Sequence, residues 1–351
     1  MLLRIQDPTQ SGIVARFNTY PIEETLTEIT IPSGTLRARL YIPKGIGHAP
    51  GMVVVHGVHH LGIEEPRLVS FARAMSASGI RVLTPELPAL ADYQIDSRSI
   101  ALIGFAARSF SANLGQKVGV LGLSFAGGLA LLAASDPQFE PYMRFVVSVG
   151  AHDDLERVSQ FLITNAISRP DGTTLKMAAH EYGRLVLIYS HVEGFFPPAD
   201  VDAARKALRL LLWENVDESR KQAELLSFSS RRKMDVLYQH HVGALDGEIN
   251  QAIARHRAEM SAVSPHGHMA LLRVPVLLLH GAADNVTPPS ELLWLQQDVP
   301  PGELKGALIS SAISHVSMEG EPSLFDKLRL VHFMAQMLEL ADDTRAVGIK
   351  P

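Results

Sequence analysis

Short apolar runs alternate with helical patterns along most of this chain, and such alternation predicts a parallel sheet covered by helices on both faces. Four strand-like runs follow one another at residues 52–56, 81–84, 118–123 and 145–149. Helical patterns separate them near residues 65–78, 97–112 and 125–134. The runs are continuously apolar rather than alternating, as expected of strands that are buried on both sides. The fold class predicted is therefore α/β, with a doubly wound, mostly parallel sheet.

Two further regions extend this predicted sheet. Residues 28–31 and 36–42 alternate in polarity around Ser33-Gly34, which predicts an antiparallel hairpin at one edge. After residue 273 the alternation resumes, with strands at 276–279 and 307–310 and a helix at about 290–297 between them. A last helix begins near Pro322, and its period places one apolar face on the residues Leu324, Leu328, Val331, Ala335 and Leu338. The complete sheet has about eight strands.

The alternation breaks off between the sixth and seventh predicted strands. From 152 to 272 the chain is helical in pattern, with Asp200 as the N-cap of one segment. An apolar insertion of this length is more typical of a helical cap over a site than of a loop. We therefore expect a doubly wound core at 1–151 and 273–351, with a cap at 152–272.

Bulk composition excludes several classes of function. The 351 residues are sufficient for one large domain with an insertion, and the net charge of -5 does not favour nucleic-acid binding. The chain has no cysteine, which excludes disulfides and a thiolate nucleophile. We see neither a signal peptide nor an apolar run long enough to span a membrane, so we expect a cytoplasmic protein whose partner is a small molecule.

The strongest local motif is Gly122-Leu-Ser124-Phe-Ala126-Gly127, which follows a predicted strand and begins a predicted helix. In a nucleophile elbow the turn around the serine is so sharp that its neighbours two positions away must be small. Gly122 and Ala126 satisfy that condition. The motif predicts Ser124 as a catalytic nucleophile, while the pattern alone, without its strand and helix, would arise often by chance.

A serine hydroxyl requires a base and an orienting acid before it can attack a carbonyl. Asp284 directly follows the predicted strand at 276–279, and His315 lies between the last strand and the last helix. Taken alone, each has an alternative role, Asp284 as a turn or N-cap residue and His315 as an ordinary loop histidine. With Ser124 they occupy carboxyl ends of predicted strands, where open α/β sheets bind ligands. The order Ser, Asp, His is the order that an elbow architecture imposes.

A fourth feature favours acyl chemistry. The run at 52–57 ends a strand with His56-Gly57, and a turn here can direct the N–H of Val58 at a substrate oxygen. With the N–H of Phe125, the residue after the nucleophile, this would form a two-donor oxyanion hole. We expect His56 itself to shape the turn rather than to take part in the chemistry.

Together these motifs resemble the α/β-hydrolase superfamily over the whole chain outside the cap. The resemblance is to the HG turn at His56-Gly57, the elbow at Ser124, the block VPVLLLHGAADNVTPP and the loop ISHVSMEG. It implies a catalytic triad of Ser124, Asp284 and His315 without a metal or organic cofactor, and the start of the chain is closest to carboxylesterase and dienelactone-hydrolase branches. Ala126 stands where glycine is commoner.

These features leave several interpretations open. Cleavage of a carboxylic ester is the favoured activity, while a thioesterase, an acyltransferase or a non-catalytic binding protein on the same scaffold would have a similar sequence. Asp153 and Asp154 occupy an alternative acid position but more simply cap the first helix of the insertion. The pairs His59-His60 and His240-His241 lack the spacing of a metal site.

Overall fold

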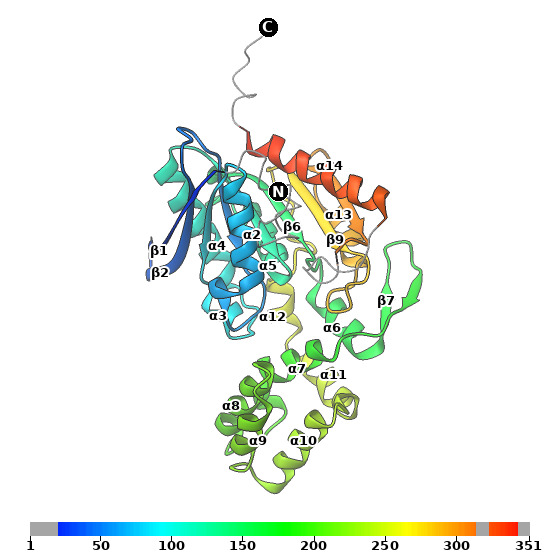
Figure 1. Ribbon diagram of the computed structural model, residues 1–351. Coiled ribbons are helices and arrows are strands. Elements are labelled where there is room, and N and C mark those ends of the chain that lie inside the picture. Colours follow the sequence, from blue (N-terminus) through cyan, green and yellow to red (C-terminus); the bar gives the residue numbers. More distant parts are fainter. Residues whose placement is uncertain (1–19, 314–322, 343–351) are drawn as a thin grey trace.

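The computed structural model describes residues 20–313 and 323–342, and within them the chain forms a mostly parallel, eight-stranded sheet (Figure 1). The strand order is β1-β2-β4-β3-β5-β6-β9-β10. Strand β2 runs antiparallel to both of its neighbours, and the strands from β4 onward pair in parallel. The strands are β1 (Ile22–Ile31), β2 (Gly34–Pro43), β3 (Gly51–Val55), β4 (Arg81–Pro85), β5 (Val118–Leu123), β6 (Met143–Val149), β9 (Val276–Gly281) and β10 (Leu304–Ser310). The predicted fold class is confirmed.

Helices cover both faces of the sheet, which explains why the central strands are apolar at every position. One face packs against α4 (Arg98–Leu114), α5 (Phe125–Ser135) and α13 (Ser290–Asp298). The other face packs against α2 (Pro66–Ala77) and α14 (Leu324–Ala341). Every residue of β3 is buried, as is every residue of β9. The carboxyl ends of these buried strands form the edge on which the candidate site lies.

The predicted packing face of α14 is wrong. Leu324, Leu328 and Val331 are 74%, 58% and 52% exposed. The helix instead buries a second apolar stripe, and its members are Leu330, Phe333, Met334, Met337 and Ala341. Both stripes have helical spacing, so periodicity alone could not decide between them.

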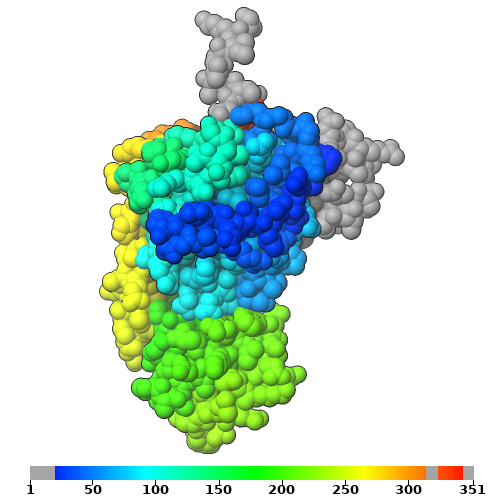
Figure 2. All heavy atoms as spheres, turned by 90° about the vertical axis from the view of Figure 1, so that its left-hand side faces the viewer, coloured from blue at the N-terminus to red at the C-terminus, as the bar shows by residue number. Residues whose placement is uncertain are grey.

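A long insertion separates β6 from β9, and in Figure 2 its green part forms a lobe beneath the blue and cyan core. Its helices are α6 (Leu155–Thr164), α7 (Glu181–Ser190), α8 (Val201–Leu212), α9 (Val216–Ala223), α10 (Phe228–Tyr238), α11 (Asp246–Arg255) and α12 (Arg257–Ala262). The expectation of a wholly helical insertion is incomplete, because β7 (Ala166–Ser168) pairs with β8 (Thr174–Lys176) as a small hairpin. The boundaries 152 and 272 stay a prediction.

The two ends of the insertion meet at the sheet edge. His152 donates from Nε2 to the carbonyl of Val263 at 2.9 Å, and Leu155 N–H donates to the Ser264 hydroxyl at 2.9 Å. These bonds join the outgoing segment to the returning one. The insertion therefore leaves the core and re-enters it at one junction. We call this junction, formed by residues 152–155 and 263–264, the root of the insertion.

Charged side chains fasten this root to α13. Arg157 forms ion pairs of 2.7 Å with both Glu291 and Asp153, and both carboxylates are fully buried. Asp154 caps α6 by accepting from the N–H groups of Glu156 and Arg157, so its predicted role is confirmed. Asp153 does not cap, and burial raises its pKa to about 7.

A second contact docks the insertion on the core further from the root. Tyr189 donates to Asp92 at 2.7 Å, and Arg209 pairs with the same carboxylate at 2.8 Å. The hydroxyl of Tyr93 donates to the carbonyl of Leu212 at 3.1 Å.

Asp200 precedes α8 as predicted, yet its side chain makes no capping bond and accepts from Ser227 and Ser230 instead. None of the described helices is long and apolar enough to cross a membrane.

Candidate active site

Ser124 lies at the sharp turn between β5 and α5. Its backbone has φ 56° and ψ −135°, a combination that residues with a side chain rarely adopt. The turn is held because Ser124 N–H donates to the carbonyl of Val149 on β6 at 2.7 Å. A serine forced into this conformation projects above the end of its strand, which is the geometry that a nucleophile elbow requires.

Close packing explains the small residues around the serine. A Cβ on Gly122 would lie 2.3 Å from the carbonyl oxygen of Ala126, a distance that backbone atoms cannot tolerate. A Cβ on Gly57 would lie 3.3 Å from Cβ of Ser124. The HG turn after β3 therefore rests directly against the elbow, so residues far apart in the sequence are neighbours at this edge.

The imidazole of His56 fixes the direction of that turn. Leu87 N–H donates to its Nε2 at 2.9 Å, so the ring proton is on Nδ1, which donates to the carbonyl of Gly57 at 2.7 Å. Burial lowers the pKa of His56 to about 4, so the ring is neutral. These contacts agree with the structural role expected of His56.

The peptide that His56 holds is the one that contains the N–H of Val58. In a trans peptide the carbonyl and the N–H point in opposite directions. Because the Gly57 oxygen points at His56, the Val58 N–H points away from that ring. Phe125 is the first residue of α5, where N–H groups have no partner within the helix. Both predicted donors thus belong to segments in contact with Ser124.

Asp284 follows β9 and is fully buried. Its Oδ1 accepts from the N–H groups of Val286 and Thr287 at 3.0 and 2.9 Å. Its Oδ2 lies 3.4 Å from Nε2 of His280, whose ring also contacts the Thr287 carbonyl at 2.9 Å. The carboxylate is thus fixed by its own loop at the edge where β5 also ends. His315, the predicted base, lies outside the described residues.

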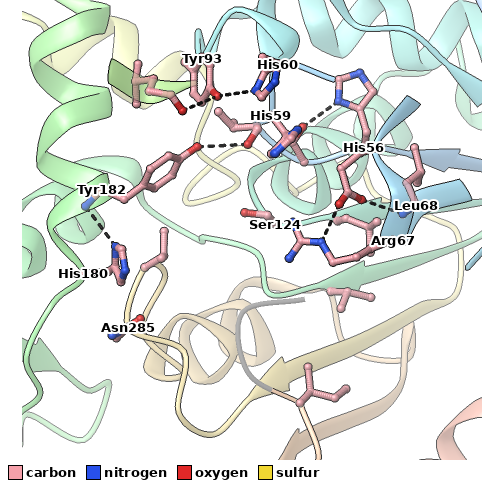
Figure 3. Close-up of a pocket in the computed structure, with 18 of the residues that line it drawn as sticks. His56, His59, His60, Arg67, Leu68, Tyr93, Ser124, His180, Tyr182 and Asn285 are labelled. Carbon is pink, nitrogen blue, oxygen red and sulfur yellow. Dashed lines mark hydrogen bonds and ion pairs between the residues drawn. The ribbon is translucent and has the colours of Figure 1, made fainter. Parts of the chain in front are cut away.

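A cavity extends from Ser124 to the insertion (Figure 3). The core contributes the HG turn, Tyr93 and the loop around Asn285. The insertion contributes an apolar wall made of Leu185, Leu211, Leu212, Val216, Leu237 and Val242. Ser124 itself is only 3% exposed, so a substrate would reach it through this cavity. The shape suits a ligand that buries an apolar group against the insertion.

Aromatic rings bridge the HG loop to the insertion on one side of the cavity. His59 stacks on His60 with ring centroids 4.7 Å apart, and His60 lies 5.3 Å from the Trp213 ring of the insertion. His60 Nδ1 also lies 3.2 Å from the Tyr93 hydroxyl. Burial lowers the pKa of His59. These contacts account for the His59-His60 pair without a metal.

The insertion also supplies site residues that sequence analysis did not identify. Tyr182, in the first turn of α7, donates its hydroxyl to the carbonyl of Val58 at 3.2 Å. The N–H of His180, which precedes the helix, donates to the carbonyl of Asn285 at 2.8 Å. Tyr182 is separated from Val58 by 124 positions, and no spacing pattern in the sequence links them.

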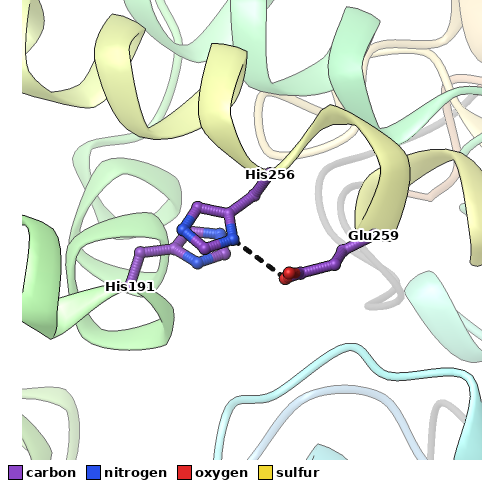
Figure 4. A group of neighbouring side chains, drawn as sticks. All are labelled: His191, His256 and Glu259. Atoms are coloured by element: carbon purple, nitrogen blue, oxygen red, sulfur yellow. Dashed lines mark hydrogen bonds and ion pairs between the residues drawn. The ribbon is translucent and has the colours of Figure 1, made fainter.

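Two groups of described side chains bring potential metal ligands together. His191 and His256 stack with centroids 3.9 Å apart and an interplanar angle of 16°, beside Glu259 (Figure 4). The ring nitrogens of nearly parallel imidazoles have their lone pairs in two separate, nearly parallel planes, whereas the ligands of one metal point at a common atom. In the other group, Asp153 pairs with Arg157, and His266 pairs with Asp298 at 2.7 Å.

Comparisons with known proteins agree with this architecture. An acylaminoacyl peptidase in complex with a peptide chloromethyl ketone matches 95% of this chain and 43% of its own, with a TM-score of 0.54 and 13% identity. The uncomplexed Pyrococcus horikoshii acylaminoacyl peptidase matches 97% of this chain and 45% of its own, with a TM-score of 0.52 and 14% identity. The chain thus spans less than half the length of these peptidases.

The structure of a putative dienelactone hydrolase from Klebsiella pneumoniae matches 90% of this chain over 99% of its own length, with a TM-score of 0.45 and 14% identity. No protein-family model matches the chain. No curated protein sequence matches it either. Likeness to the two acylaminoacyl peptidases, at 13% and 14% identity, establishes a shared fold alone, and the chemistry has to be argued from the site itself.

Proposed function

We propose that this chain, which has the α/β-hydrolase fold, is a serine hydrolase that cleaves a carboxylic ester through an acyl-enzyme on Ser124. The observation that most supports the proposal is the strained backbone of Ser124 at the end of β5. Strain of this kind is costly and persists where the surrounding structure requires it, most often at functional sites. The HG turn packed against Ser124 and the buried Asp284 after β9, two strands away from β5, give further support.

In the proposed mechanism, His315 accepts the proton of the Ser124 hydroxyl as the oxygen attacks the substrate carbonyl. The negative charge that develops on the carbonyl oxygen is stabilised by the N–H groups of Val58 and Phe125. Asp284 orients the His315 ring and stabilises its protonated form. His315 then donates the proton to the departing alcohol, and water activated by the same histidine releases the acid.

The cavity favours a substrate with an uncharged, apolar arm. Leucine and valine side chains form most of the insertion's side of the cavity, where Glu181 and Glu214 also line it. Arg67 is already paired with Glu65 at 2.7 Å. A carboxylic ester of small to medium size places its carbonyl at Ser124 and its apolar arm against that wall. We therefore propose carboxylesterase activity, with peptide bonds as the less favoured class because the amide groups of a peptide would lose their hydrogen bonds to water against this wall.

The test is reaction with a fluorophosphonate, with the adduct located by mass spectrometry and Ser124→Ala as the matched control. We expect one adduct per chain on Ser124 and none on the variant. Hydrolysis of p-nitrophenyl esters of increasing acyl length then measures the ester preference, and thioesters and added alcohols test thioesterase and acyltransferase activity. Folded protein that neither reacts with the probe nor hydrolyses any ester would refute the proposal and favour a binding protein.

A further inference from the structure

The start of α7 contacts loops on both sides of Ser124. The Tyr182 hydroxyl donates to the carbonyl of Val58 in the HG turn, and the His180 N–H donates to the carbonyl of Asn285, next to Asp284. In Figure 3, Tyr182, His180 and Asn285 follow one below another to the left of Ser124. One short segment of the insertion thus bonds to both loops that the proposed mechanism uses.

The bond from Tyr182 acts on the peptide next to the proposed oxyanion donor. Val58 N–H belongs to the peptide between Gly57 and Val58, whose carbonyl is held by His56 at 2.7 Å. The Val58 carbonyl belongs to the following peptide, and Tyr182 holds it at 3.2 Å. The two planar units share only the Cα of Val58. The donor is therefore fixed from the core on one side and from the insertion on the other.

Tyr182 is itself well held. The His180 ring accepts the Tyr182 N–H at 3.2 Å and so caps α7, while the Tyr182 ring packs edge-on against Tyr93 with centroids 6.2 Å apart. Burial raises the pKa of Tyr182 far above its usual range, so the hydroxyl keeps its proton and remains a donor. A buried phenol with one defined acceptor is suited to fix a backbone group.

We propose that Tyr182 is a positioning residue that holds the HG turn so that the Val58 N–H is aligned for the oxyanion, which makes the insertion part of the catalytic apparatus. This inference rests on the proposed function of Ser124. Without the bond, Val58 can rotate about its Cα, and the N–H spends less time in the direction that stabilises the transition state. The loss falls on the transition state rather than on substrate binding.

The experiment compares Tyr182→Phe with Tyr238→Phe. Tyr238 also lies in the insertion and bonds to the Ser219 hydroxyl at 2.8 Å, so it controls for losing a buried phenol elsewhere. A third protein carries 4-fluorophenylalanine at position 182, which fills the space of the hydroxyl without donating. Fluorophosphonate titration of Ser124 counts the competent sites in each preparation, so partly folded material does not distort kcat.

We expect Tyr182→Phe and the fluorinated protein to lose about tenfold in kcat, less than the loss of a direct oxyanion donor, with KM within about twofold. The inhibition constant of an aryl trifluoromethyl ketone, which forms an oxyanion on the serine, should rise by the same factor. Tyr238→Phe should match the wild type. Unchanged kcat or ketone affinity, or an effect confined to KM, would overturn the inference.

The same experiment separates the two proposals. A wild-type protein that neither hydrolyses esters nor reacts with the fluorophosphonate refutes the proposed function and, with it, this inference. A wild-type protein that does both, while Tyr182→Phe behaves like Tyr238→Phe, refutes the role of Tyr182 alone. If Tyr182→Phe fails to fold, the fluorinated protein, which preserves the packing, gives the decisive comparison.

Discussion

The core and the insertion hold their halves of the cavity by different means. On the core side, Ser124 and Asp284 are placed by buried strands and by backbone bonds within their own turns. On the insertion side, Tyr182 is placed by a helix that reaches the core through side-chain contacts and through one backbone bond, from His180 N–H to the Asn285 carbonyl. A strand end that is hydrogen-bonded within a sheet has little freedom, whereas a helical lobe joined by a few bonds can shift relative to the sheet. Substitutions on the core side should therefore abolish catalytic activity, and substitutions on the insertion side should reduce it only in part.

The largest expected effect is the loss of Asp284. In Asp284→Asn the amide oxygen still accepts from Val286 and Thr287, so the loop keeps its shape while the charge is removed. We expect kcat to fall by about 10³-fold or more, because the base loses its orienting carboxylate. Steady-state ester hydrolysis measures this, with the melting temperature as the check on folding.

An Asp284→Asn protein that keeps its activity would place the acid elsewhere. Asp153, which follows β6, is then the residue to test. Asp153→Asn would in that case abolish activity, whereas the present proposal expects it to affect mainly the root of the insertion, where Asp153 pairs with Arg157.

The next effect concerns how firmly the core holds the insertion at two of the contacts described above. At the root, Glu291 is fully buried and accepts from Arg157 and from the N–H groups of Asp153 and Asp154. Removing one partner of a buried ion pair typically costs about 3 kcal/mol or more, so Glu291→Ala should lower the free energy of unfolding by about that amount. Urea denaturation measures the difference.

The exposed contact provides the matched control. Arg209 and Asp92 form their ion pair at 34% and 40% side-chain exposure. A pair exposed to this degree contributes about 1 kcal/mol or less, so Arg209→Ala should cost much less than Glu291→Ala. Equal losses in the two variants would show that the insertion is not fixed chiefly at its root.

How much of this could be predicted from the sequence differs between the two regions for a physical reason. Strands at 118–123 and 276–279 and the residues at their carboxyl ends follow from local polarity patterns, so the positions of Ser124 and Asp284 at strand ends could be predicted. Tyr182 could not be found, because its partner lies 124 positions away and is a backbone carbonyl, which leaves no trace in residue type. A contact between two separately folded segments has no spacing signal.

Two misjudged elements had signals that were weak rather than missing. The hairpin of β7 and β8 turns at Pro170-Asp171-Gly172, a sequence typical of turns, and Asp171 accepts from the Thr173 N–H at 2.9 Å. Its strands are only three residues long, too short for period-2 alternation to be recognised. In α14 two apolar stripes compete, and only the sheet decides which of them is buried.

A smaller effect should appear in the pH dependence of stability, and it arises from His191 in the insertion. Burial, together with His256 and Arg255, lowers the pKa of His191 from its usual 6.5 to about 4, while Glu259 and Glu193 oppose this shift. Between pH 6.5 and 4 the unfolded chain binds a proton that the folded chain does not, so stability falls as the pH falls through this range. Above pH 6.5 this contribution to the pH dependence vanishes.

The variant His191→Phe keeps a flat ring against His256 and removes the titration. Between pH 7.5 and 5 we expect the variant to lose about 1 to 2 kcal/mol less stability than the wild type. Urea denaturation at the two pH values checks this, with ester hydrolysis at pH 7.5 expected to be unchanged. Parallel losses in the two proteins would assign the acid sensitivity to other groups, of which buried His56 in the core is the first to examine.

The smallest expected effect measures the free-energy cost of the backbone strain at Ser124. Ser124 and an alanine at the same position must both adopt φ 56° with a Cβ, whereas glycine adopts this conformation readily. We expect the free energy of unfolding of Ser124→Gly to be about 1 kcal/mol higher than that of Ser124→Ala, with both variants inactive. Urea denaturation of the pair isolates the backbone contribution, because neither variant retains the hydroxyl. If the glycine protein is no more stable than the alanine protein, the elbow stores no strain. The role of Ser124 is then supported only by its position beside the HG turn and by the probe reaction.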